Sequence, residues 1–272
     1  MPAIRQHILF ALILLATGEL SPASAQQTTI NNATLTVPPG AIPGGDDLFV
    51  GTTGTGVLNI VTGGVVTTFE ATLGQFATGV GTVNVTGPAA TLTTLSNFYI
   101  GALGTGALNI TGGGVVTSSQ GADLGDQVGG TGTVSISGTG SVWNGGDTTV
   151  GGFGAGTLTI SNGGVFNGDS VILGSSTGSV GTVNVSGPAS QFNMTGTLSI
   201  GDDGDGTFNV QTAPRSTSTT STSANPKVRG YSTSRAAAPS SVTMSSSAIS
   251  AISARVRPMS PAPERHGPSV GA

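Results

Sequence analysis

The sequence predicts an all-β protein whose strands wind into a right-handed parallel β-helix of about seven coils. Two observations predict this fold. Short apolar units recur about every 25 residues, and glycines bracket nearly all of them. Glycine accounts for 46 of the 272 residues, and each interior glycine disfavours a helix by about 1 kcal/mol relative to alanine. Short strands joined by tight turns are therefore favoured over helices throughout the repeat.

The N-terminus has the pattern of a secretory signal peptide over residues 1–25. Arg5 provides the charged start, Ile8–Ala16 the apolar run and Ala23–Ala25 the small-residue cleavage site. The apolar run is too short to span a bilayer. We therefore expect an exported chain that begins near Gln26, has no membrane-spanning segment and resides in the periplasm, at the cell surface or outside the cell. The chain has no cysteine, so disulfides do not stabilise it.

Residues 26–47 match the repeat poorly. Solenoids need an atypical terminal unit to cover the open edges of their sheets. We therefore expect this segment to form an N-terminal cap or an atypical first coil.

Residues 48–210 form the repeat domain, and its clearest units read GVLNI (56–60) and GTVNV (81–85). The third residue of this unit recurs 24 to 26 residues apart, at Leu58, Val83, Leu108, Val134, Leu158, Val183 and Phe208. Successive strand residues point to opposite faces. We therefore expect these side chains to stack inside the helix at a spacing of about 4.8 Å. The alternate positions should face water, and they are Asn59, Asn84, Ser135, Thr159, Asn184 and Asn209.

Each period contains two further apolar units, which gives three strands per coil. One ends in an aliphatic residue followed by glycine, at Val50, Leu73, Ile100, Leu124, Val150, Leu173 and Ile200. The other carries Val66, Leu92, Val116, Trp143, Phe166 and Phe192, and we expect its three aromatic residues to fill the core. A β-sandwich or an antiparallel roll is the alternative, but neither explains why equivalent positions recur in one register over seven copies.

Residues 211–272 differ from the repeat in composition and charge, and we expect a disordered basic tail rich in Ser, Thr, Pro and Ala. The segment from Gln26 to Val210 has ten acidic residues and no Lys, Arg or His, whereas the tail has seven basic residues and one acidic residue. The basic residues are not clustered between aromatic ones, so we expect no nucleic-acid partner. The abrupt change also suggests a shifted reading frame that truncated a longer protein.

The repeat domain lacks the residues on which most catalytic sites depend, and we predict no catalytic, cofactor-binding or metal-binding site and no cofactor. It has no His, Cys, Lys or Arg for acid–base, nucleophilic or oxyanion chemistry. Asp123 and Asp126 are the carboxylate pair considered for glycoside hydrolysis, and we expect both to be solvated turn residues. The acidic group most suited to calcium is Asp202, Asp203 and Asp205, but it lacks the spacing of an EF-hand loop.

The repeated pattern (V/I)G-x-x-G-x-G-x-L-N-I-x-x-G-G-V-V, followed by L-G and G-T-V-N-V-S-G, resembles a known family. It is similar to the type V secretion and PEP-CTERM-associated repeat of bacterial surface proteins, which occurs in autotransporter passenger domains. The matching stretches are 50–74, 100–125 and 150–173, each with the G-T-V unit that follows it, and the resemblance covers about residues 48–210. It implies an exported cell-surface β-helix and supplies no catalytic residues.

Three functions remain open. The first is a non-enzymatic exported cell-surface scaffold that resembles an autotransporter passenger and is adhesive. Its partner would be a glycan or a cell surface, and it could also self-associate through the open end of the solenoid. The second is an exported polysaccharide-active β-helix enzyme, which would need Glu70, Asp123, Asp147 and Asp169 to cluster on one face. The third is a truncated fragment of a longer autotransporter that lacks its barrel.

Overall fold

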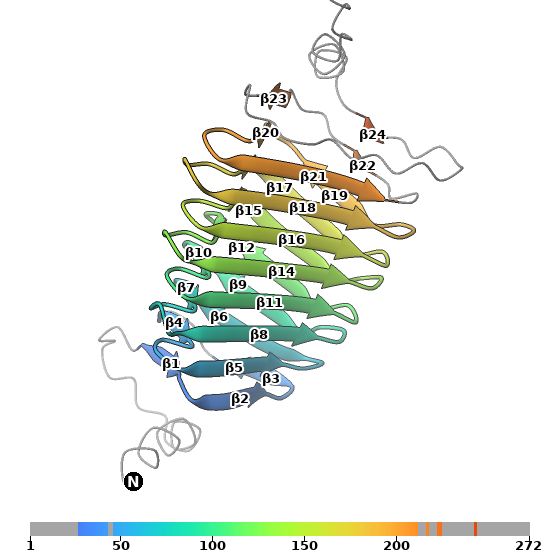
Figure 1. The fold of residues 1–272 in the computed structure, drawn as a ribbon. Helices are drawn as coiled ribbons and strands as arrows, with labels where there is room; N and C mark the ends of the chain where they lie inside the picture. Colours follow the sequence, from blue (N-terminus) through green and yellow to red (C-terminus); the bar gives the residue numbers. More distant parts are fainter. Residues whose placement is uncertain (1–26, 43–45, 212–215, 218–221, 225–241, 244–272) are drawn as a thin grey trace, which may run out of the picture.

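The protein is a right-handed parallel β-solenoid, as the sequence predicts (Figure 1). The computed structural model describes residues 27–42 and 46–211, together with 216–217, 222–224 and 242–243. Strands of the front face run left to right in Figure 1, and the chain returns behind them while it rises, which is right-handed winding. Seven coils are complete, from β1–β3 to β17–β19, and β20 and β21 begin an eighth.

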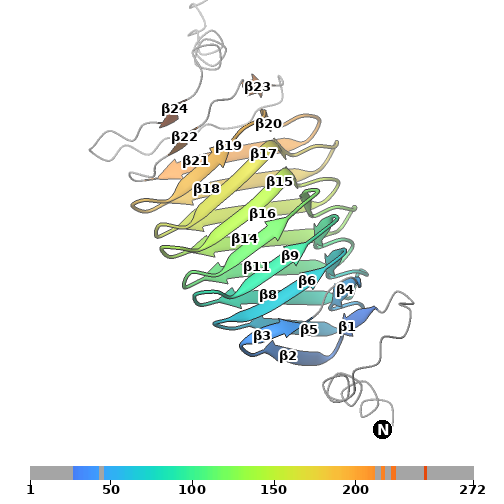
Figure 2. The same cartoon turned by 180° about the vertical axis from the view of Figure 1, so that it is seen from behind.

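Three faces make up each coil, and every strand pair between coils is parallel. The front face consists of β2 (Ala33–Val37), β5 (Thr55–Ile60), β8 (Val80–Thr86), β11 (Thr105–Thr111), β14 (Thr131–Ser137), β16 (Ala155–Ser161), β18 (Val180–Ser186) and β21 (Asp205–Gln211). The back face, seen in Figure 2, consists of β3 (Gly40–Ile42), β6 (Gly64–Thr68), β9 (Thr91–Thr94), β12 (Val115–Ser118), β19 (Gln191–Met194) and the first parts of β15 (Val142–Val150) and β17 (Val165–Leu173).

The third face is narrow because its strands are only three residues long. It consists of β1 (Thr28–Ile30), β4 (Leu48–Val50), β7 (Ala71–Leu73), β10 (Phe98–Ile100), β13 (Ala122–Leu124), the ends of β15 and β17, and β20 (Leu198–Ile200). β23 (Thr222–Ala224) pairs with β20, and β22 (Ser216–Thr217) pairs with β24 (Val242–Thr243). The narrow face joins the back face in one sheet because β15 and β17 run through the corner between them.

The predicted register is confirmed in all three columns. Leu58 pairs with Val83, Val83 with Leu108, and the column continues in register to Phe208. On the narrow face an equally continuous column runs from Val50 to Ile200, and on the back face one runs from Val66 to Phe192. Side chains of all three columns are buried. Each coil alone could not cover these residues, so stacking is what stabilises the fold.

Aromatic side chains fill the interior of the later coils, as predicted. Trp143, Phe166 and Phe192 are in register on the back face and buried. Ring centroids are 5.2 Å apart for Trp143 and Phe166, and 5.1 Å apart for Phe166 and Phe192. Trp143 Nε1 donates a 3.2 Å hydrogen bond to Ser118 Oγ of the coil below, so the indole is buried with its polar atom satisfied.

The corner between the narrow and front faces explains both the aliphatic–glycine dipeptides and their alternating spacing. Gly74 has φ +67°, and a Cβ there would lie 2.3 Å from the Thr105 carbonyl oxygen of the coil above. Corners of four residues (51–54, 101–104, 151–154 and 201–204) alternate with corners of six (74–79, 125–130 and 174–179). Each longer corner contains an extra turn, such as the one that Gly79 N closes on Phe76 O at 2.7 Å.

Residues 28–42 continue all three columns downward: β1, β2 and β3 pair in register with β4, β5 and β6. The predicted signal peptide lies outside the described residues, as does most of the predicted disordered tail. The part of the chain that the structure describes contains no helix of the length and apolarity needed to cross a membrane.

Candidate binding face

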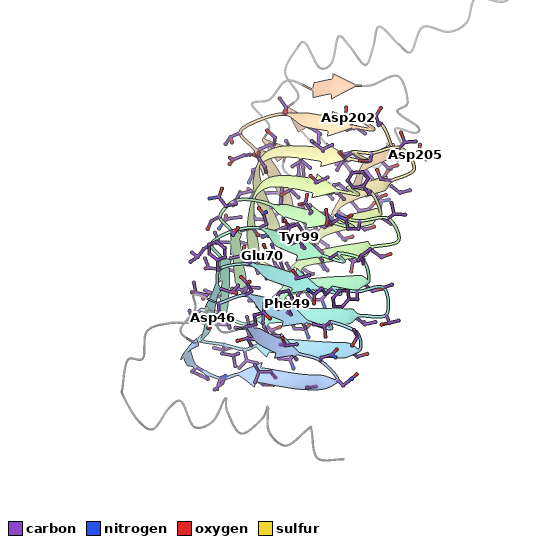
Figure 3. All side chains as sticks on the ribbon, turned by 90° about the vertical axis from the view of Figure 1, so that its left-hand side faces the viewer. Asp46, Phe49, Glu70, Tyr99, Asp202 and Asp205 are labelled. Carbon is purple, nitrogen blue, oxygen red and sulfur yellow. The ribbon has the colours of Figure 1, made fainter. Side chains whose placement is uncertain are left out.

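The outward side of the narrow face changes in chemistry along the rod. Its central residues form one column in register: Phe49, Thr72, Tyr99, Asp123, Thr149, Ile172 and Ser199. Each is the middle residue of a three-residue strand segment whose neighbours point inward. The two aromatic residues lie on the first coils of this column, and Figure 3 shows both on the same side of the rod.

Phe49 and Tyr99 enclose Thr72, which lies between them in the column. Thr72 points outward, yet only 5% of its surface is exposed. Its direct neighbours in the column are Phe49 below and Tyr99 above. Tyr99 Oη also accepts a 2.9 Å hydrogen bond from Asn97 Nδ2, which fixes the direction of the phenol ring. We call Phe49, Thr72 and Tyr99 the aromatic face.

A second column runs beside the aromatic face, formed by the residue that directly precedes each of these strands. It consists of Asp47, Glu70 and Asn97, because the residues that follow them, Leu48, Ala71 and Phe98, are paired in register. Asp47 and Glu70 are thus carboxylates on consecutive coils. Partial burial, with the neighbouring charge of Asp47 as a second cause, raises the pKa of Glu70 above its ordinary value. Figure 3 shows Asp46 and Glu70 on the side that carries Phe49 and Tyr99.

Further large apolar side chains are exposed at the corners of the same coils. Phe69 and Leu95 lie at the corner toward the back face, and Phe76 and Leu103 at the corner toward the front face. Their exposed fractions range from 41% to 53%. Val128, Phe153 and Val180 are also exposed, at or next to the front-face corner of later coils, so exposed apolar side chains are not confined to the coils of the aromatic face.

The position of Asp123 differs from the one expected from the sequence. It was expected to be a solvated turn residue, but it is the middle residue of β13, directly above Tyr99 in the outward column. Burial raises its pKa above the ordinary value, and the charge of Asp126 adds to that rise, while a hydrogen bond with Thr149 opposes it. Asp126 follows at the corner, where its Oδ2 accepts a 2.8 Å hydrogen bond from Gln127 Nε2.

The four acidic residues considered for catalysis do not gather at one place. Asp123 lies on the narrow face itself, while Glu70, Asp147 and Asp169 are at the corner toward the back face. Asp147 Oδ1 accepts a 3.0 Å hydrogen bond from Ser170 N, and Asp169 Oδ1 accepts one of 2.7 Å from Thr195 Oγ1. These bonds link neighbouring coils, so both carboxylates have a structural role.

Asp202, Asp203 and Asp205 lie on the corner of the last coil, and all three are exposed. Figure 3 shows Asp202 and Asp205 at the end of the rod opposite the aromatic face. Among the residues that the structure describes, no three His, Cys, Asp or Glu side chains are grouped so that they could hold a metal ion.

Asparagine ladders occupy outward positions on the two wide faces. Asn84 Nδ2 donates to Asn59 Oδ1, and Asn109 Nδ2 donates to Asn84 Oδ1, at 2.8 and 2.9 Å. Equivalent bonds join Asn209 to Asn184 on the front face, and Asn193 and Asn144 to Asn167 on the back face. These side chains point outward as predicted, but stacking leaves them half-buried rather than fully solvated.

Sequence reasoning missed the aromatic face. The relevant signal was present, because Phe49 and Tyr99 are the middle residues of LFV and FYI, where alternation directs the side chain outward. The burial of Thr72 between them could not be predicted, since it depends on which residues of different coils become neighbours. Comparison of the chain with protein-family models, with curated proteins and with solved structures found no match.

Proposed function

We propose that this protein is a non-enzymatic, exported cell-surface scaffold of the autotransporter-passenger type. The observation that supports it best is the unbroken register of three inward columns over the whole described rod. The inward side chains pack in the core of the rod, so the outward side chains are available to contact other molecules. The signal-peptide pattern at residues 1–25 and the resemblance of the repeat agree with export.

A stacked rod is suited to presentation because it is extended and stiff. Eight front-face strands at about 4.8 Å spacing give a rod about 34 Å long. Asparagine ladders add side-chain hydrogen bonds between coils to those of the backbone. Adhesion to a glycan or a cell surface would use the aromatic face, where large rings lie beside carboxylate and amide groups.

Fractionation of native cells with an antibody against residues 48–210 tests the proposal. We expect the chain in the outer-membrane, surface or secreted fraction, with the N-terminus of the mature protein near Gln26. Recovery in the cytoplasm with Met1 retained would contradict export. Translation of the other reading frames downstream of codon 210 addresses the truncated-fragment alternative, which requires that one frame continues the 25-residue repeat.

The environment of Asp123 favours one second candidate, an enzyme that acts on polysaccharides. A half-buried carboxyl group whose pKa is raised can serve as a general acid, with Asp126 as the second carboxyl group. Incubation with neutral polysaccharides should then release reducing ends, and Asp123→Asn should abolish the release. Thr149→Val is the control, because it removes the hydrogen-bonding neighbour of Asp123 and keeps the carboxyl group.

A further inference from the structure

The aromatic face and the column beside it form a grid suited to a cationic partner. Asp47 and Phe49 lie on one coil, Glu70 and Thr72 on the next, and Asn97 and Tyr99 on the third. Leu48 N donates to Glu70 O at 2.9 Å, so Asp47 and Glu70 follow each other at the spacing of adjacent coils. Two carboxylates at this spacing repel each other, and a cation placed between them would relieve that repulsion.

The described part of the solenoid has no cation of its own to supply. No Lys, Arg or His occurs from Gln27 to Gln211. Every Lys and Arg after Arg5 belongs to the C-terminal segment, and they are Arg215, Lys227, Arg229, Arg235, Arg255, Arg257 and Arg265. Acidic and basic residues are therefore separated along the chain, which makes one part complementary to the other.

We propose that the aromatic face and its carboxylates bind the arginine-bearing C-terminal segment of this chain, residues 235–265. Arginine can interact with both the aromatic rings and the carboxylates of this surface. Its guanidinium stacks on aromatic rings such as Phe49 and Tyr99, and its fork of N–H donors binds carboxylates such as Asp47 and Glu70. A neutral sugar would use the rings but has no charge to place between the carboxylates, and anionic glycans or nucleic acids would be repelled.

The segment is long enough to reach the site within one molecule. Six coil steps separate Phe49, the far end of the site, from Ser199 in the outward column, which is about 29 Å. Ala224 of β23 pairs with Ile200 next to Ser199, and Arg255 follows Ala224 by 31 residues, which span up to about 100 Å when fully extended. A second molecule of the same protein is the other source of this segment. An external ligand of this face would have to displace the segment in either case.

Trypsin provides the test, because its sites after Arg5 all lie beyond Gln211, and those of the proposed segment are among them. In the full-length protein we expect Phe49→Ser/Tyr99→Ser and Asp47→Asn/Glu70→Gln each to accelerate cleavage after Arg235 or Arg255 by about fivefold. High salt should accelerate cleavage of the unmodified protein similarly. Cleavage rates unchanged in both double variants would overturn the proposal. Trp143 fluorescence, from a buried residue remote from these substitutions, reports whether each variant is folded.

The matched control is Asp202→Asn/Asp203→Asn, which removes the same charge at the opposite end of the rod. We expect this variant to be cleaved at the same rate as the unmodified protein. If it is cleaved as fast as Asp47→Asn/Glu70→Gln, the effect depends on overall charge and the proposal of a specific site is wrong. Protection that does not vary with protein concentration identifies binding within one molecule, and protection that rises with concentration identifies binding between molecules. If the face binds a neutral oligosaccharide saturably and does not protect the segment from trypsin, the face is a glycan-binding site instead.

Discussion

Asn84 and Asn59 are joined by a hydrogen bond of 2.8 Å between side chains of consecutive coils, from Nδ2 of Asn84 to Oδ1 of Asn59. Asn109 continues the ladder by donating to Asn84 Oδ1. Asn84 thus uses both its donor and its acceptor between coils. A backbone register that places equivalent residues directly above each other makes this possible, and the same register gives each outward residue two fixed neighbours.

Replacement of the central asparagine should destabilise the rod measurably. Asn84→Ala removes two hydrogen bonds, and at about 1 kcal/mol each we expect a loss of about 2 kcal/mol in the free energy of unfolding. Chemical denaturation monitored by circular dichroism measures it. Thr159→Ala is the control at the equivalent position of another coil, and it should cost less. A loss no larger for Asn84→Ala than for Thr159→Ala would show that the ladder adds nothing to stability.

The register and the inward columns were predictable from the sequence because each depends on a local period. Leu58, Val83 and Leu108 carry the same neighbours at the same spacing, so one rule places all three. The burial of Thr72 and the raised pKa of Asp123 were not predictable, because each depends on the outward residues of other coils. Outward residues follow no period here: Phe49, Thr72, Tyr99 and Asp123 occupy equivalent positions and share no chemistry.

Corner glycines should differ in their tolerance of alanine according to the space above them. Gly74→Ala combines a positive φ with a Cβ 2.3 Å from the Thr105 carbonyl oxygen, so we expect a loss of about 3 kcal/mol or more in stability. Gly178→Ala is the matched control, since its φ is +84° and nothing lies within 4 Å of the added Cβ. That change should cost only about 1 kcal/mol. Equal losses in thermal denaturation would contradict the close approach of coils at Gly74.

The aromatic stack should be a large single contribution to core stability. Phe166 lies between Trp143 and Phe192 and is fully buried. Phe166→Ala should therefore cost about 3–5 kcal/mol, with a change in Trp143 fluorescence as its neighbouring ring is lost. Phe153→Ala makes the same chemical change at a side chain that is 53% exposed, and it should alter stability by no more than about 0.5 kcal/mol. Denaturant titration of both variants compares them directly.

The contribution of Glu70 to stability should be more favourable in mild acid than at neutral pH. Its folded-state pKa is raised above the ordinary value of 4.5, so the folded state binds a proton more readily than the unfolded state. Stability from this group is therefore present below pH 4.5 and is lost as pH rises through the raised pKa. Glu70→Gln should remove that part of the pH dependence and raise the melting temperature at pH 7. Asp47→Asn should reduce the dependence without abolishing it, because burial is the larger cause. Parallel curves of melting temperature against pH for the unmodified protein and Glu70→Gln would refute the assignment.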